Sequence, residues 1–187
     1  AQVRSREPDA VVLLGDVFEG HGEPRAGFRP VFESIRAPLG TWAVLGNHDL
    51  GHGRGEAPGV ALLEAAGVRV LRDRSEEVRP GLVLAGVDDL TSRLRRGPIE
   101  GAVTRALAGR PKGATILLSH SPLLAEEAAS AGAGLILAGH THGGQIWPFS
   151  YLVAQRYPLL AGRYEVAGMT VLVSRGTGLW GPRLRLW

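Results

Sequence analysis

The sequence predicts an α/β fold in which short buried strands alternate with helices. With 187 residues, the chain fits a single domain and is long enough to bury a substantial core. Its share of 44% hydrophobic and 21% charged residues is ordinary for a globular protein. Short apolar runs recur with helix-like stretches between several of them, and this alternation is typical of layered α/β domains.

The predicted strands are four or five apolar residues long and rich in Val, Ile and Leu. Such runs are typical of strands that are covered on both faces. They lie within residues 10–16, 41–49, 68–71, 81–89, 114–120, 134–140 and 169–176.

The predicted helices lie at 57–67, 98–109 and 121–132. Each ends at a glycine, the residue that most often follows the last helical turn. Pro122 is expected in the first turn of the third helix, where its missing N–H costs nothing. The chain shows no internal repeat and no low-complexity linker, which favours one domain.

Composition excludes several classes of protein and of site. Without cysteine, the chain has no disulfide scaffold and no thiolate metal site, so a metal would need His, Asp, Glu or Asn ligands. Basic residues exceed acidic ones only by 21 to 18, and the densest basic cluster, within 93–96, contains no aromatic residue, which disfavours nucleic acid as a partner. No apolar run approaches the roughly 20 residues that a membrane-spanning helix needs.

Polar residues of the types that bind metals follow four of the predicted strands directly. In open α/β sheets, ligands bind beyond the carboxyl ends of the strands, so these side chains are expected to converge. The residues are Asp16; Asn47, His48 and Asp49; His120; and His140 with His142.

Each of these strand ends also has an ordinary structural interpretation. An aspartate after a strand is commonly a turn or a helix cap, and a single histidine is commonly a hydrogen-bonded loop residue. Four unrelated accidents at equivalent positions are a poorer explanation than one shared site. Asp, Asn and His donors suit Mn, Fe or Zn, and two cations about 3.5–4 Å apart can hold a phosphoryl group between them.

The motifs "LLGDVFEG", "LGNHDLG", "LLSHSP" and "LAGHTHGGQ" occur in the order of a known family. The chain resembles the calcineurin-like metallophosphoesterase superfamily, whose motifs are D-x-H, G-D, G-N-H-D/E, H and G-H-x-H. The later segments "GGQIWPF" and "VSRGTGLWGP" are similar to a branch of bacterial membrane-associated phosphodiesterases. Some members of that branch cleave the pyrophosphate of UDP-diacylglucosamine.

The resemblance implies a fold, a reaction and a role for each motif residue. The fold is an α/β sandwich of two mixed β-sheets flanked by helices, with two divalent metal ions (Mn, Fe or Zn) at the strand ends. The reaction is hydrolysis of a phosphodiester or pyrophosphate bond by a metal-bound hydroxide. Asp16 would bridge both metals. The second metal would also be bound by Asn47, His120 and His140, and the first by His142. His48 would assist the leaving group and would be oriented by Asp49.

The sequence departs from the family because D-x-H is absent. Residues 1–10 resemble the tail of the helix that follows this motif. We therefore expect a domain over 1–187 that is incomplete at both ends and lacks its first β-strand. Such a chain would bind one metal at most and be weakly active, and the alternative is a catalytically impaired remnant that binds or scaffolds.

The resemblance also bears on partners and location. The expected substrate is a phosphoester, either a small molecule or lipid-linked, and a membrane surface is a candidate partner. The expected location is the cytoplasm or the periphery of a bacterial membrane. The substrate itself, the native metal and the oligomeric state stay open.

Five further residues have more than one interpretation each. His21 and His52, in glycine-rich loops, are exposed loop residues, substrate contacts or substitutes for the missing ligand. Asp88 and Asp89 end a strand that we assign to a second sheet, and they are structural or face the substrate. Arg175 either meets a phosphate or forms a surface ion pair.

Overall fold

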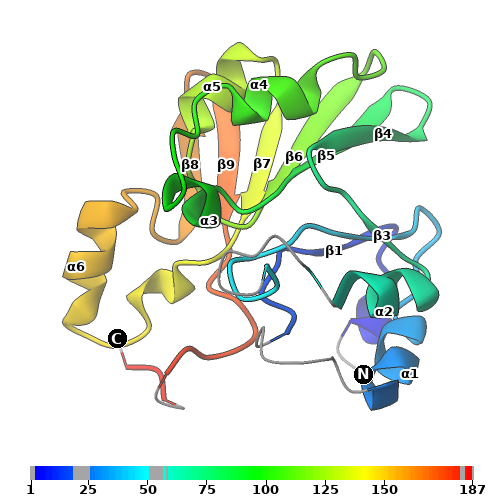
Figure 1. Ribbon diagram of the computed structural model, residues 1–187, viewed down its shortest axis with the longest axis horizontal. Helices are drawn as coiled ribbons and strands as arrows, with labels where there is room; N and C mark the ends of the chain where they lie inside the picture. The colour runs from blue at the N-terminus through cyan, green and yellow to red at the C-terminus, as the bar shows by residue number, and fades with distance from the viewer. Residues whose placement is uncertain (1–2, 19–25, 51–56, 58, 182–183, 187) are drawn as a thin grey trace.

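The computed structural model describes residues 3–18, 26–50, 57, 59–181 and 184–186, which form two β-sheets flanked by helices (Figure 1). This arrangement confirms the predicted α/β fold. The strands are β1 (Val11–Leu13), β2 (Thr41–Ala43), β3 (Val68–Val70), β4 (Arg74–Arg79), β5 (Leu82–Val87), β6 (Ala114–Ser119), β7 (Leu135–Ala138), β8 (Gly162–Val166) and β9 (Met169–Val173). The helices are η1 (Arg4–Arg6), η2 (Ala26–Phe28), α1 (Arg29–Glu33), α2 (Gly59–Ala65), α3 (Leu90–Leu94), α4 (Ala102–Leu107), α5 (Ala125–Ser130), η4 (His142–Gly144) and α6 (Phe149–Arg156).

The two sheets differ in size and in strand direction. The smaller one has the order β1-β2-β3, and both of its described pairings are parallel. The larger one has the order β4-β5-β6-β7-β9-β8, in which parallel strands form the centre and β4 and β8 pair antiparallel at the two edges. Since parallel neighbours end at the same edge of a sheet, each sheet presents a row of carboxyl ends.

The sheets pack face to face through a cluster of large apolar side chains. Alternate residues of a strand point to opposite faces, so Trp42 and Val44 face the larger sheet while Ala43 and Leu45 face the helices. Leu118 of β6 meets them from the other side, and its neighbour Leu117 packs into the opposite layer. These strands are therefore covered on both faces, which explains why their sequences are continuously apolar.

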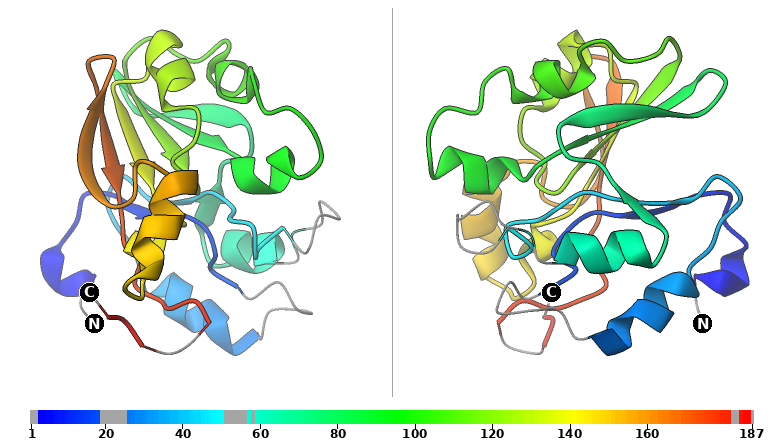
Figure 2. Two further views of the ribbon diagram at one scale, coloured as in Figure 1. Left: turned by 90° about the vertical axis from the view of Figure 1, so that its left-hand side faces the viewer. Right: turned by 45° about the vertical axis from the view of Figure 1, so that its right-hand side comes forward.

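Helices cover the outer face of each sheet. Helices α4 and α5 lie over the larger sheet, and α2 lies against the smaller one (Figures 1 and 2). The predicted helices at 57–67, 98–109 and 121–132 correspond to α2, α4 and α5, which are shorter than predicted. Gly67, Gly109 and Gly132 follow them with positive φ, the backbone conformation that ends a helix at glycine.

Several elements differ from the sequence-based prediction. Helix α5 begins at Ala125, so the assignment of Pro122 to its first turn was wrong. Strands β4 and β8 and helices α1, α3 and α6 were not predicted. The edge strands carry charged, partly exposed residues instead of an apolar run, and α6 buries none of its residues. Among the described residues, no helix has the length and hydrophobicity that crossing a membrane requires.

Candidate metal centre

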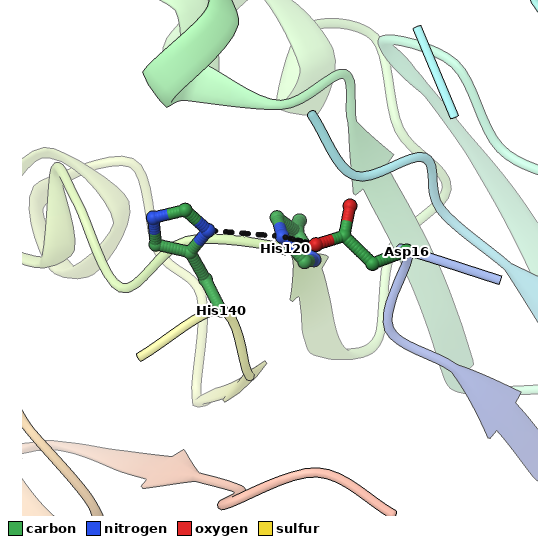
Figure 3. Close-up of side chains that lie close together, drawn as sticks. All are labelled: Asp16, His120 and His140. Atoms are coloured by element: carbon green, nitrogen blue, oxygen red, sulfur yellow. Dashed lines mark hydrogen bonds and ion pairs between the residues drawn. The ribbon is translucent and has the colours of Figure 1, made fainter. Parts of the chain in front are cut away.

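The carboxyl ends of strands from both sheets meet at one place. Asp16 follows β1 of the smaller sheet, whereas His120 and His140 follow β6 and β7 of the larger one. One potential ligand atom from each of these three residues lies within 4.8 Å of the other two (Figure 3). Residues far apart in the chain thus present one carboxylate and two imidazoles to a common point.

His120 lies between the other two members of this group. Its Nε2 is 3.2 Å from Asp16 Oδ2 and 3.1 Å from His140 Nδ1 (Figure 3). Its Nδ1 lies 2.6 Å from the carbonyl oxygen of Leu14, so it donates its proton there and directs Nε2 toward the group. A second ring nitrogen held by a backbone carbonyl is the usual way in which proteins orient a metal-binding histidine.

Backbone conformation also directs these side chains. Asp16, His140 and His142 have φ values of 53°, 68° and 51°, in the left-handed region that residues other than glycine rarely adopt. Such a conformation costs about 1–3 kcal/mol and is concentrated at functional sites. Residues such as Asp73 and Ala167 adopt the same conformation elsewhere, so the strain supports the site only together with the convergence of the side chains.

Two glycines allow the loops after β1 and β2 to approach each other. A Cβ on Gly46 would lie 2.1 Å from Asp16 Oδ1, and one on Gly15 would lie 2.7 Å from His120 Nδ1. Both positions therefore require glycine. This contact explains why a glycine precedes both Asp16 and Asn47.

Burial and mutual charge shift the pKa values of the group in different directions. Burial by itself raises the pKa of Asp16, but the hydrogen bond and charge of His120 and the N–H of His48 bring it below the usual value. Burial and the charge of His120 lower the pKa of His140 to about 4. Burial lowers the pKa of His142 as well. Burial by itself lowers the pKa of His120, but the hydrogen bond and the charge of Asp16 bring it above the usual value. A cation would therefore have to replace a proton on His120, after which a carboxylate and imidazole nitrogens form a donor set suited to a transition metal.

Two further predicted ligands have buried atoms that lack a hydrogen-bond partner among the described residues. These are Asn47 Oδ1 and His142 Nδ1. A buried polar atom that lacks a partner is costly, so its retention needs an explanation. The carbonyl oxygen and the imidazole nitrogen are both suitable metal donors, and the residues present therefore fit divalent cations.

The predicted catalytic residues His48 and Asp49 both contact the loop after β1. His48 donates its backbone N–H to Asp16 Oδ1 at 2.9 Å, and this bond holds it beside the group. The buried Asp49 accepts backbone N–H groups from Val17 and Phe18 on one oxygen and from Gly46 on the other. In the described part of the chain, Asp49 thus ties the loops after β1 and β2 together, which differs from the expected contact with the His48 ring.

The structure bears differently on the five residues for which the sequence left more than one interpretation. Asp88 forms a bidentate ion pair with Arg72, and Asp89 caps α3 by accepting the N–H of Ser92, which supports the structural interpretation. The Arg175 side chain lies over Gly143, next to His142. His21 and His52 lie outside the described residues.

Sequence reasoning missed Tyr157 at the end of α6. Its hydroxyl oxygen is 3.0 Å from His140 Nε2 and 3.2 Å from Thr91 Oγ1 of α3. No local pattern marks Tyr157, because its contact with His140 arises only when α6 folds back onto the strand ends.

An α/β sandwich with a carboxylate and imidazoles at the strand ends between its sheets defines the class of metal-dependent hydrolases that act on phosphoesters. The family described as calcineurin-like phosphoesterase matches residues 1–144. The chain belongs to this family, and the resemblance to the superfamily is confirmed.

Curated relatives come from bacteria and animals. An uncharacterized metallophosphoesterase of Campylobacter jejuni is 32% identical over 100% of this chain and 50% of its own length. One of Aquifex aeolicus is 34% identical over 99% of this chain and 71% of its own length. A transmembrane protein with metallophosphoesterase domain from Danio rerio is 33% identical over 100% of this chain and 45% of its own length. The chain spans about half the length of most of the relatives compared.

Proposed function

We propose that this chain hydrolyses a phosphodiester or pyrophosphate bond with divalent metal ions held at the strand ends. The observation that supports this proposal best is the convergence of Asp16, His120 and His140 within 4.8 Å from two different sheets. Family membership supports the reaction class, and the two buried donor atoms without partners support the metal.

We assign the ligands to two positions around Asp16. Asn47, His120 and His140 complete a position with four protein donors. Among the described residues, we assign His142 and Asp16 to a second position, and two donors are too few for tight binding. We therefore expect one tightly bound cation per chain. Divalent cations held by these residues would supply charge neutralisation for the phosphoryl oxygens and would acidify a water molecule.

The remaining residues of the site act on substrate and leaving group. The backbone N–H of His48 bonds to Asp16, and the charge of His48 acts on that carboxylate. We assign the His48 imidazole the role of donating a proton to the departing oxygen or stabilising its charge. Asp49 acts on this step by holding the loop that carries His48. Arg185, whose charge acts on His142, adds positive charge near this ligand.

The test is metal-dependent hydrolysis by the purified chain after removal of bound metal. We expect bis-p-nitrophenyl phosphate to be hydrolysed on addition of Mn²⁺ and not in the presence of a chelator. Elemental analysis should find about one cation per chain. Asp16→Asn should lose both the bound cation and the activity, because Asp16 contributes to both positions.

Asp73→Asn is the matched control. Asp73 also accepts hydrogen bonds, from the N–H of Asp88 and from Arg93, but it contacts no predicted ligand. It should keep both metal and activity. Hydrolysis that survives chelation, or that Asp16→Asn leaves unchanged, would contradict the proposed function. Metal binding without hydrolysis would favour the binding remnant instead.

We further propose that the substrate is lipid-linked, as in the membrane-associated branch. Five exposed side chains beside the site form what we call the apolar rim. They are 56–68% exposed and comprise Trp147, Phe149, Tyr151, Leu152 and Trp180. Both ends of α6 adjoin the site, since η4 precedes it and Tyr157 follows it. Gln145 accepts the N–H of Trp180 at 2.7 Å and so keeps that residue near His142.

Paired substrates test this part of the proposal. UDP-diacylglucosamine should be cleaved with a lower KM than UDP-N-acetylglucosamine, which lacks the long acyl chains. Phe149→Ser should raise the KM only for the acylated substrate. Val31→Ser, at an apolar residue of α1 that is 54% exposed, should change neither value. Equal KM values for the two substrates would contradict a lipid-linked substrate.

A further inference from the structure

We propose that Tyr157 is a positioning residue for the metal ligand His140, and this inference rests on the proposed function. Its hydroxyl is the described hydrogen-bond partner of His140 Nε2, at 3.0 Å. The other nitrogen of the same ring, Nδ1, faces His120 and Asp16. One side of the imidazole thus faces the candidate metal centre while the opposite side is held by Tyr157.

The direction of the hydrogen bonds follows from this arrangement. A histidine that coordinates through Nδ1 must carry its proton on Nε2. Nε2 then donates to the Tyr157 oxygen, and the Tyr157 proton goes to Thr91 Oγ1, 3.2 Å away. The chain of two hydrogen bonds selects the tautomer whose Nδ1 lone pair points toward Asp16 and His120.

Packing keeps the tyrosine in place. Tyr157 is 9% exposed, and its ring meets the His140 ring edge to face, with the centroids 4.9 Å apart. Its backbone N–H bonds to the carbonyl of Val153 at 2.8 Å, which fixes it at the end of α6. Thr91, buried on α3, holds the hydroxyl from the far side. His140 is therefore oriented by two helices outside the strand ends that carry the ligands.

The His140 backbone makes such support necessary. Its φ of 68° is unfavourable for a residue with a side chain, so the loop alone does not favour this orientation. Hydrogen bonds to the far nitrogen of a metal-binding histidine typically change metal affinity by about 10- to 100-fold. Tyr157 contributes such a bond without being a ligand.

The experiment measures Mn²⁺ affinity of the whole chain by titration calorimetry. Tyr157→Phe keeps the ring and removes only the hydroxyl, so we expect the Kd for Mn²⁺ to rise about tenfold or more. In Co²⁺-loaded protein, the visible absorption bands of the metal should shift. Thr91→Val should weaken binding to a smaller extent, and Thr91→Ser, which retains the hydroxyl, should restore it.

Tyr164→Phe provides the matched control. The Tyr164 hydroxyl bonds the backbone of Ala161 and contacts no predicted ligand. This variant should keep the parent affinity. In a double-mutant cycle, Tyr157→Phe should have no further effect once His140 is replaced by alanine, because the tyrosine acts through that ring.

The outcomes separate this inference from the proposed function. If the parent binds Mn²⁺ and Tyr157→Phe binds it with the same Kd and the same Co²⁺ spectrum, the positioning role is wrong and the metal site stands. If the parent chain binds no divalent cation, both proposals fail. A loss of affinity that persists unchanged in the His140→Ala background would also overturn the positioning role.

Discussion

At the scale of single residues, the strand ends of this protein show how a short loop can present a donor atom. Asp16 and His140 each lie within three residues of the end of a strand and adopt a left-handed backbone. This conformation turns the chain sharply, so that the side chain leaves the sheet at its carboxyl end. Gly15 and Gly46 then let two such turns touch. The glycines before Asp16 and Asn47 are therefore needed for the close approach of the loops that carry these two donors.

His48 allows a residue-scale prediction. If its imidazole protonates the leaving group, His48→Ala should lower kcat by about 100-fold or more. The loss should grow with the pKa of the leaving phenol or alcohol, because a good leaving group needs no proton. Activity against a series of aryl phosphodiesters measures this dependence.

Metal affinity is the control for this prediction. The His48 ring is outside the group of Asp16, His120 and His140, so His48→Ala should bind Mn²⁺ as the parent does. An equal loss for all leaving groups, or a loss of the cation, would show that His48 has another role.

At the scale of elements, the sequence predicted a helix or strand correctly where a residue type has one dominant structural role, as glycine has at a helix end. Gly67 and Gly132 ended predicted helices, and the apolar run around Leu117 formed a central strand. Strand β4 escaped prediction because an edge strand has one partner and tolerates charge. Its residues Arg74 and Glu76 form an ion pair on the surface.

The residues of the candidate site also divide into those that the sequence could predict and those that it could not. Asp16, His120 and His140 could be selected because each follows an apolar strand, a pattern visible within a few residues. Tyr157 could not, since its link to His140 depends on where α6 packs. Likewise, nothing in the sequence showed that the Asp49 carboxylate would be used by three backbone N–H groups.

Glu127 of α5 allows an element-scale prediction. Its carboxylate accepts the N–H groups of Gly101 and Thr104, each at 2.8 Å, and so caps the first turn of α4. Glu127→Gln should lower the free energy of unfolding by about 1 kcal/mol, at the low end for a cap because solvent screens the charge. Urea denaturation measures this change, and the neighbouring exposed Glu126→Gln serves as the control.

The contribution of Glu127 should depend on pH. Burial tends to raise its pKa, but the N–H donors of Thr104 and Gly101 outweigh burial and bring it below the ordinary value of 4.5. The stabilisation is therefore fully present above pH 4.5 and is lost as the pH falls through the lower pKa of the folded state. A difference between parent and Glu127→Gln that stays constant from neutral pH down to acid unfolding would contradict this explanation.

At the scale of the whole molecule, the candidate metal centre joins the two sheets. Asp16 belongs to the smaller sheet, and His120 and His140 belong to the larger one. The apolar cluster around Trp42, Leu84 and Leu118 already holds the sheets face to face. A cation bound by ligands from both would act as a second connection at one edge of this contact.

Metal binding should therefore raise the stability of the entire fold. A ligand that binds only the folded chain at 100 times its Kd adds about 2.7 kcal/mol, which corresponds to a rise in Tm of about 5–10 °C for a chain of this size. Calorimetric melting with and without Mn²⁺ measures the shift. Asp16→Asn removes the carboxylate that the smaller sheet contributes, while Asn47 and the two histidines remain, so its Tm should respond little to Mn²⁺. An equal rise in Asp16→Asn would mean that the cation binds without Asp16 and that this carboxylate does not connect the two sheets.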